Sequence, residues 1–210
     1  VATTWNESTP CNLTLHDQAE AIKKSISKNG GTPREFTAIS VSDGIAMGHE
    51  GMKSSLISRE VIADSVELMM RGHCYDALVG IAGCDKSLPG MMMVMLRLNL
   101  PAIFLYGGTI MPGKYEGKDI TVQDVYEAVG AHSAGKISDE ELYKIECGAC
   151  PGAGSCGGQF TANTMACVAE AIGIAYPGSS AFPAIDKDRS KIHEIYGETI
   201  INLLKEDIKP

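Results

Sequence analysis

Three glycine-containing segments hold most of the residues that could do chemistry. Ser42-Asp43-Gly44 leads into Gly48-His49-Glu50-Gly51, Cys84-Asp85-Lys86 forms a second segment, and residues 147–158 form a third. Carboxylates suit Mg²⁺, and thiolates suit iron or zinc. Cys84-Asp85-Lys86 therefore places a soft and a hard ligand side by side. The spacing leaves simpler readings open, because an Asp after a strand is often a turn former and a single Cys is often buried as an apolar side chain.

The third segment carries Cys147, Cys150 and Cys156 in the pattern Cys-x2-Cys-x5-Cys. Three thiolates so close in sequence could bind one metal centre. Zinc would need a fourth ligand, which no standard spacing supplies here. An iron–sulfur cluster also uses thiolates, and a glycine-rich turn with incidental cysteines is a third interpretation. Among the histidines, only His49 lies in such a glycine-rich loop.

Composition excludes several classes of function. The chain has 210 residues, 44% of them apolar, and a net charge of -8, which argues against a nucleic-acid-binding surface. The longest apolar stretch, residues 91–106, is interrupted by polar residues and proline, so no membrane span is expected. There is no P-loop, G-x-G-x-x-G or G-x-S-x-G motif. The seven cysteines are an odd number, and with no signal peptide expected they do not indicate a disulfide framework.

Hydrophobic periodicity predicts alternating strands and helices. Strands are expected over residues 36–41, 77–82 and 102–106, and helices over 13–28, 56–70, 88–98, 119–133, 160–174 and 186–205. Another helix should follow Ser138, where a capping box begins, and Thr121 should cap the helix at 119–133. Residues 42–52, 114–119 and 147–158 are expected to be loops. Cys74, Cys167 and the methionines at 91–95 are expected in the core.

This alternation indicates an α/β fold, with a mostly parallel sheet flanked by helices on both faces. Such sheets bind ligands at the carboxyl ends of their strands. The loops after Val41, Ala82 and Tyr106 should therefore converge on one edge. No linker divides the chain, so residues 1–210 are expected to form one domain. Because the chain begins with Val1 rather than Met, we expect it to be part of a longer protein.

Four motifs together resemble the family of dihydroxy-acid, phosphogluconate and sugar-acid dehydratases. They are Thr9-Pro10-Cys11-Asn12, residues 42–49 (SDGIAMGH), Gly83-Cys84-Asp85-Lys86, and residues 154–163 (GSCGGQFTAN). The motifs occur in the family's order, and the resemblance covers nearly the whole chain. The segment at residues 43–49 is similar to the dihydroxy-acid branch rather than to the sugar-acid branches.

The resemblance implies a different metal set from the one suggested by local spacing. It implies a [2Fe-2S] cluster bound by Cys11, Cys84 and Cys156, with Cys147 and Cys150 left out. Family members without a cysteine at the position of Cys11 resemble [4Fe-4S] enzymes, so this residue favours the smaller cluster. The resemblance also implies Mg²⁺ bound by Asp43, Asp85 and a carbamylated Lys86.

The activity implied is hydro-lyase chemistry. In the family, 2,3-dihydroxyisovalerate and 2,3-dihydroxy-3-methylvalerate lose water to give 2-keto acids in valine and isoleucine biosynthesis. Mg²⁺ would bind the carboxylate and the C2 oxygen, while a cluster iron with an open position acts as Lewis acid on the C3 hydroxyl.

The resemblance also implies parts that this chain lacks. The family's general base, a serine, and a glutamate ligand to Mg²⁺ lie in a second, β-barrel-like C-terminal domain. No catalytic base is therefore expected within residues 1–210, and the isolated chain should not turn over. The expected partners are a dihydroxy-acid substrate, the C-terminal domain and a second subunit in a homodimer, with no nucleic acid or membrane. The location is expected to be cytoplasmic in bacteria, and plastid or mitochondrial in eukaryotes.

Three alternatives remain at this stage. The first is a sugar-acid dehydratase, which is also a hydro-lyase of the same family. An iron–sulfur electron-transfer module is a second, although a redox carrier normally saturates its cluster with four protein ligands. A zinc-stabilised binding module using Cys147, Cys150 and Cys156 is the third.

Overall fold

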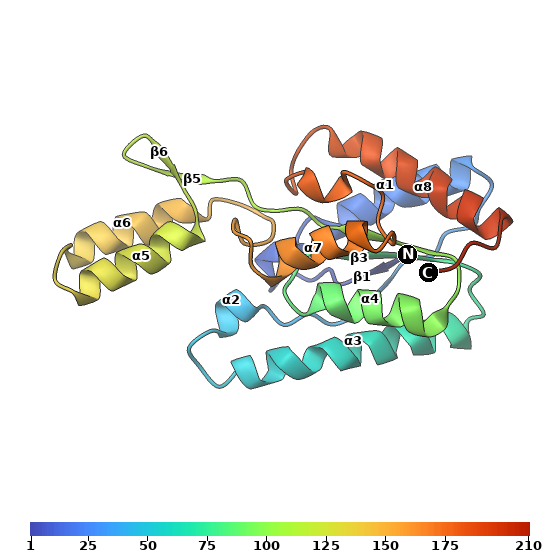
Figure 1. Ribbon diagram of the computed structural model, residues 1–210, viewed down its shortest axis with the longest axis horizontal. Coiled ribbons are helices and arrows are strands. Elements are labelled where there is room, and N and C mark those ends of the chain that lie inside the picture. Colours follow the sequence, from blue (N-terminus) through green and yellow to red (C-terminus); the bar gives the residue numbers. More distant parts are fainter.

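A four-stranded parallel sheet forms the centre of the molecule (Figure 1). The computed structural model describes residues 1–210. The strand order is β2-β1-β3-β4, and the strands are β1 (Ala2–Thr3), β2 (Phe36–Thr37), β3 (Leu78–Ala82) and β4 (Ala102–Tyr106). Every residue of β3 and β4 is buried. Parallel strands without polar side chains require cover on both faces, and the helices supply it.

Two helical layers cover the sheet. Helices α1 (Leu15–Lys28) and α8 (Arg189–Lys205) pack on one face, where their apolar residues join one core cluster with those of β3 and β4. Helices α3 (Met52–Gly72), α4 (Ser87–Leu98) and α7 (Thr161–Ala171) share the larger core cluster on the other face. The predicted α/β architecture is thereby confirmed. Met91, Met92 and Met95 are buried in this second core, as predicted, and Met93 packs against it.

A smaller lobe projects from the sheet, drawn in yellow at the left of Figure 1. It contains the antiparallel hairpin of β5 (Gly113–Tyr115) and β6 (Lys118–Ile120), and the helices α5 (Val122–Ser133) and α6 (Asp139–Ala149). Thr121 and Asp124 form a full capping box at the start of α5. Ser138 caps α6 by accepting a hydrogen bond from the Glu141 amide at 3.2 Å. Local signals therefore determine most of this lobe.

Several predicted boundaries are wrong. The strand predicted over residues 36–41 is only two residues long, and β1 was not predicted, because two-residue strands carry no alternation and are defined by the neighbours they pair with. The predicted loop at residues 114–119 belongs to a hairpin, so the next helix starts at Val122. The predicted loop at 42–52 contains a short helix, α2 (Asp43–Ala46). Residue 147 is helical rather than irregular, because α6 continues to Ala149.

No helix in the chain combines the length and the apolar character that crossing a bilayer requires.

Candidate functional site

Three cysteines from distant parts of the chain meet at the carboxyl edge of the sheet. Cys11 lies in a 3-10 turn, η1 (Pro10–Asn12), Cys84 follows β3, and Cys156 lies in the loop before α7. All three line one cavity of about 440 Å³. Cys11 and Cys84 are buried, and Cys156 is half-buried. The structure therefore brings together the three cysteines that the family resemblance pointed to.

The three thiols are electrostatically linked. The pKa of the Cys11 thiol is raised by its hydrogen bonds to Cys156 and Cys84 and by burial. The same hydrogen bonds from Cys11 lower the pKa of Cys84, and lower that of Cys156 to about 7. The neighbouring Cys11 thiol thus favours the thiolate forms of Cys84 and Cys156. Thiolates are the form in which cysteine binds metals.

Backbone hydrogen bonds connect the cysteine-bearing loops. The Gly154 amide donates to the Pro10 carbonyl at 3.1 Å, and the Ser155 amide donates to the Gly108 carbonyl at 3.0 Å. The buried Ser155 hydroxyl donates to the carbonyl of Gly83. Gly154 has a φ of +135°, a backbone conformation that residues other than glycine rarely adopt.

Glycine is required at position 83 for a different reason, because the backbone of Cys11 lies very close to it. A Cβ atom at this position would collide with the carbonyl oxygen of Cys11. The turn that carries Cys11 can therefore lie directly on the end of β3 only because residue 83 has no side chain. This contact places Cys11 next to Cys84.

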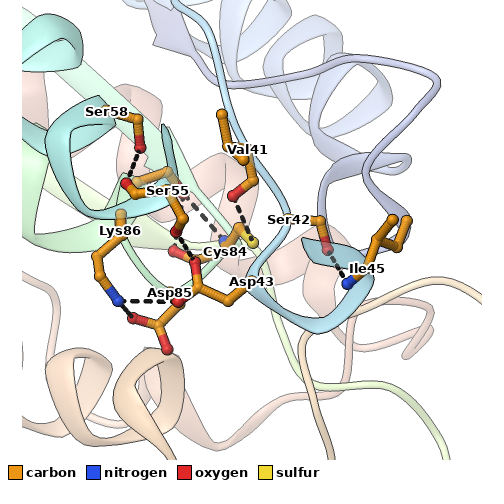
Figure 2. Close-up of polar contacts among 10 residues, drawn as sticks. Val41, Ser42, Asp43, Ile45, Ser55, Ser58, Cys84, Asp85 and Lys86 are labelled. Atoms are coloured by element: carbon orange, nitrogen blue, oxygen red, sulfur yellow. Dashed lines mark hydrogen bonds and ion pairs between the residues drawn. The ribbon is translucent and has the colours of Figure 1, made fainter. Parts of the chain in front are cut away.

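Asp43, Asp85 and Lys86 form a charged group beside the thiols (Figure 2). The Lys86 Nζ atom lies 2.9 Å from Asp43 Oδ2 and 2.6 Å from Asp85 Oδ1. Burial disfavours the ammonium form, but the hydrogen bonds to Asp85 and Asp43 outweigh it, so the pKa of Lys86 is raised. The buried Ser55 hydroxyl donates to Asp43 Oδ1. Two carboxylates thus face a single cationic group next to the cavity.

Local structure orients these side chains. Asp43 is the first residue of α2, and Ser42 caps that helix by accepting a hydrogen bond from the Ile45 amide at 3.4 Å. On the neighbouring loop, the Cys84 amide donates to the Ser87 hydroxyl at 3.0 Å, and Lys86 lies at the start of α4. The Cys84 sulfur lies 3.8 Å from the carbonyl oxygen of Val41. This last contact joins the loops that follow β2 and β3 (Figure 2).

Other cavity residues were not predicted as site residues. The Asn163 side-chain amide donates to the carbonyl of Cys156 at 3.1 Å, and the Tyr106 hydroxyl donates to Asn163 Oδ1. Met47, Tyr126 and Phe160 also line the cavity. Met47, Phe160 and Asn163 lie in motifs that carried the family resemblance, and this is the one signal that could have found them. Tyr126 lies in none of these motifs and depends on where α5 meets the cavity.

The remaining cysteines lie elsewhere. Cys147 and Cys150 are exposed and do not line the cavity. Cys74 and Cys167 were predicted to be in the core, and this is wrong, because both are exposed. Cys74 follows the end of α3 at a φ of 51°, outside the packed face of that helix. Cys167 is on the outer side of α7, whose buried side is lined by Ala162, Ala166 and Ala169.

One further group has metal-ligand geometry. Ligand atoms of His16, Glu20 and Glu35 all lie within 4.8 Å of one another. Lys23 lies between the two carboxylates, with its Nζ 2.9 Å from Glu35 Oε2 and an ion pair to Glu20. The lysine therefore already provides the positive charge there. His49 is exposed and does not line the cavity.

Comparison with known proteins shows the family to which the chain belongs. The model of the family "Dihydroxy-acid/6-phosphogluconate dehydratase N-terminal" matches residues 1–210. The chain therefore belongs to this family, as the resemblance predicted. It is 66% identical over its full length to a dihydroxy-acid dehydratase of Pelagibacter ubique and 64% identical to one of Parvibaculum lavamentivorans. A dihydroxy-acid dehydratase of Sulfurisphaera tokodaii is 54% identical. The chain spans 36–38% of the length of these relatives.

Proposed function

We propose that this chain is the cluster- and magnesium-binding N-terminal domain of a dihydroxy-acid dehydratase. The observation that carries the proposal is the meeting of three thiols and two carboxylates from separate loops in one cavity. Relatives that are 54–66% identical over the whole chain are named for this activity. The proposed reaction is dehydration of 2,3-dihydroxyisovalerate and 2,3-dihydroxy-3-methylvalerate to the 2-keto acids of valine and isoleucine biosynthesis.

Cys11, Cys84 and Cys156 would hold a [2Fe-2S] cluster. The donor set fits, because the three sulfurs face one cavity and two of the thiols have lowered pKa values. When bound, the cluster would supply a Lewis-acidic iron for the C3 hydroxyl, and Mg²⁺ would supply charge at the substrate carboxylate and C2 oxygen.

Asp43, Asp85 and Lys86 would hold Mg²⁺. The two carboxylates fit a hard cation, and the Lys86 ammonium marks the position where positive charge is favoured. An ammonium group has no lone pair to offer a metal. Carbamylation of Lys86 would replace it with carboxylate-like oxygens, and we propose this modification here. Ser55 would keep Asp43 oriented through its hydrogen bond.

The roles of this chain are thus to bind and orient rather than to move the C2 proton. Asp43 and Asp85 are both committed to Lys86, and Cys11 is buried among thiols. We propose that residues 1–210 form one domain and that the general base, a serine, and a glutamate ligand lie in a β-barrel-like C-terminal domain. We also propose a homodimer, located in the cytoplasm of bacteria or in plastids or mitochondria of eukaryotes.

A sugar-acid dehydratase is the second candidate, because the matching family includes 6-phosphogluconate dehydratases. Both candidates share the cluster and the metal site. They differ in the substrate beyond C3, which is an alkyl group in one case and a chain of hydroxyls in the other.

The first experiment measures iron, acid-labile sulfide and zinc per chain after purification without oxygen, both for residues 1–210 and for the full-length protein. We expect about two irons and two sulfides per full-length chain. Stoichiometric zinc without iron in both proteins would contradict the proposal. The full-length protein should dehydrate 2,3-dihydroxyisovalerate, whereas residues 1–210 alone should not. Steady turnover by the isolated chain would show that the C-terminal domain is not needed.

A further inference from the structure

Two chemically different groups of side chains line the cavity. One contains Asp43, Asp85 and the three thiols, and the other contains the large side chains of Met47, Tyr126 and Phe160. We refer to Met47, Tyr126 and Phe160 as the apolar wall. These three residues come from the end of α2, from α5 and from the loop before α7. Nothing in the proposed metal chemistry uses them.

The residues of the apolar wall contact one another. The rings of Tyr126 and Phe160 meet edge to face, with centroids 6.3 Å apart and an interplanar angle of 66°. The Tyr126 hydroxyl lies 3.6 Å from the Met47 sulfur, which is a weak acceptor. The tyrosine hydroxyl is therefore paired with a sulfur rather than with a strong polar group. The wall presents ring faces, ring edges and a thioether.

Features outside the metal site position the wall. The capping box of Thr121 and Asp124 determines where α5 begins and places Tyr126 in the second turn. A side chain at Gly158 would collide with the Phe160 ring, so glycine at this position makes room for the ring. The lobe thus contributes one residue to a cavity that otherwise belongs to the sheet edge.

A small hydroxy acid has one orientation that suits such a cavity. With the proposed Mg²⁺ held by Asp43 and Asp85, its carboxylate and adjacent hydroxyl would lie at the metal site, which leaves the end of its carbon chain for the other lining residues. An alkyl end loses little by leaving water, whereas hydroxyls placed against ring faces and a thioether lose hydrogen bonds that these groups do not replace. The wall would favour an alkyl end over a polyhydroxylated one.

We propose that the apolar wall is the specificity-determining part of this domain and selects 2,3-dihydroxy acids with alkyl ends against polyhydroxylated sugar acids. This inference rests on the proposed function and adds to it the residues that set the substrate class. Tyr126 is the central member, because it contacts both Met47 and Phe160.

The test uses the full-length enzyme with its cofactors. It compares kcat/KM for 2,3-dihydroxyisovalerate with kcat/KM for D-gluconate. In Tyr126→Ser, which replaces the ring with a small hydroxyl, we expect the preference for the alkyl acid to fall by about tenfold or more. Tyr126→Phe should change the preference less than about threefold, because it keeps the ring. Tyr143→Ser is the matched control, since Tyr143 is an exposed tyrosine on α6 that does not line the cavity.

The outcomes separate the two hypotheses. If wild-type enzyme with a full cluster dehydrates neither acid or only gluconate, the proposed function is wrong. If it prefers the alkyl acid and Tyr126→Ser keeps that preference unchanged, only the apolar wall is wrong. If Tyr126→Ser loses iron, the same comparison is made with Met47→Gln. Met47 is 51% exposed, so a polar side chain of similar length fits at this position. An unchanged preference in a Met47→Gln enzyme with normal iron content would equally overturn the inference.

Discussion

Cys147 and Cys150 are close in sequence, whereas Cys11, Cys84 and Cys156 come from three distant loops. The first pair lies at the end of α6, on the projecting lobe, and is exposed to solvent. The distant three line a single cavity at the sheet edge. The pattern that looks most like a metal motif in the sequence is thus not the one that the fold assembles. Parallel strands bring the loops at their carboxyl ends together regardless of the distance between them in the chain.

The surroundings of the two sets differ as well. Hydrogen bonds from Gly154 to Pro10 and from Ser155 to Gly83 join the loop of Cys156 to the segments that carry Cys11 and Cys84. The lobe is organised mainly by its own caps and its hairpin. A metal site needs ligands held in a defined geometry, and hydrogen-bonded loops on a rigid sheet provide that better than the end of an exposed helix.

The largest expected difference is in iron content. Cys156→Ser should lose the cluster, because it removes one of three thiolates, while Cys150→Ser should keep it. The measurement is iron and acid-labile sulfide per chain after purification of the full-length protein without oxygen. Iron lost from Cys150→Ser and retained in Cys156→Ser would show that the local cysteine motif binds the metal after all.

In the wild-type protein, thiol reactivity should separate the three cysteines that line the cavity from the four that do not. We expect iodoacetamide to label Cys74, Cys147 and Cys167 in the cluster-loaded chain, since all three are exposed. Exposed Cys150 should also be labelled but more slowly than these three, because burial raises the pKa of its thiol. Cys11, Cys84 and Cys156 should react at least about tenfold more slowly until the cluster is removed, because burial and metal binding withhold the thiolate. Peptide mass spectrometry with time identifies each site. Equal labelling of all seven before cluster removal would contradict the assignment.

The smallest expected effects come from two serines with different tasks. Ser155→Ala leaves the carbonyl of Gly83 without its buried donor, and should lower the free energy of unfolding by about 1–3 kcal/mol and weaken cluster retention. Ser138→Ala removes the cap of α6, and should cost about 1 kcal/mol with no change in iron content. Urea unfolding and iron analysis of both variants make the comparison. Iron loss in Ser138→Ala would show that the lobe also supports the cluster.

Much of the fold was predictable because its elements are long and periodic. The strands at residues 78–82 and 102–106 and the helices that cover them follow directly from apolar pattern and caps. The two-residue strands β1 and β2 were missed or misjudged, since their identity depends on pairing with neighbours. The prediction that Cys74 and Cys167 lie in the core was wrong because Cys74 follows the end of α3 and Cys167 lies on the outer side of α7.

The candidate site was predictable only in part. Strand ends located Asp43, Cys84 and Asp85, but spacing alone favoured Cys147 and Cys150 as partners of Cys156, and only the family resemblance pointed to Cys11. Ser55 and Tyr126 carried no signal, because their contribution depends on how separate helices meet. The assignment of ligands to particular metals stays a prediction for the experiments above.

By itself, the sequence determined the class of fold, the helix caps and which loops follow buried strands, because these depend on interactions between residues that are near one another in the chain. Only the tertiary structure decided which cysteines meet, that Lys86 lies between Asp43 and Asp85, and that the lobe places Tyr126 in the cavity. Those relations join segments far apart in sequence. They arise from sheet order and from the close approach that Gly83 permits, neither of which has a local signature.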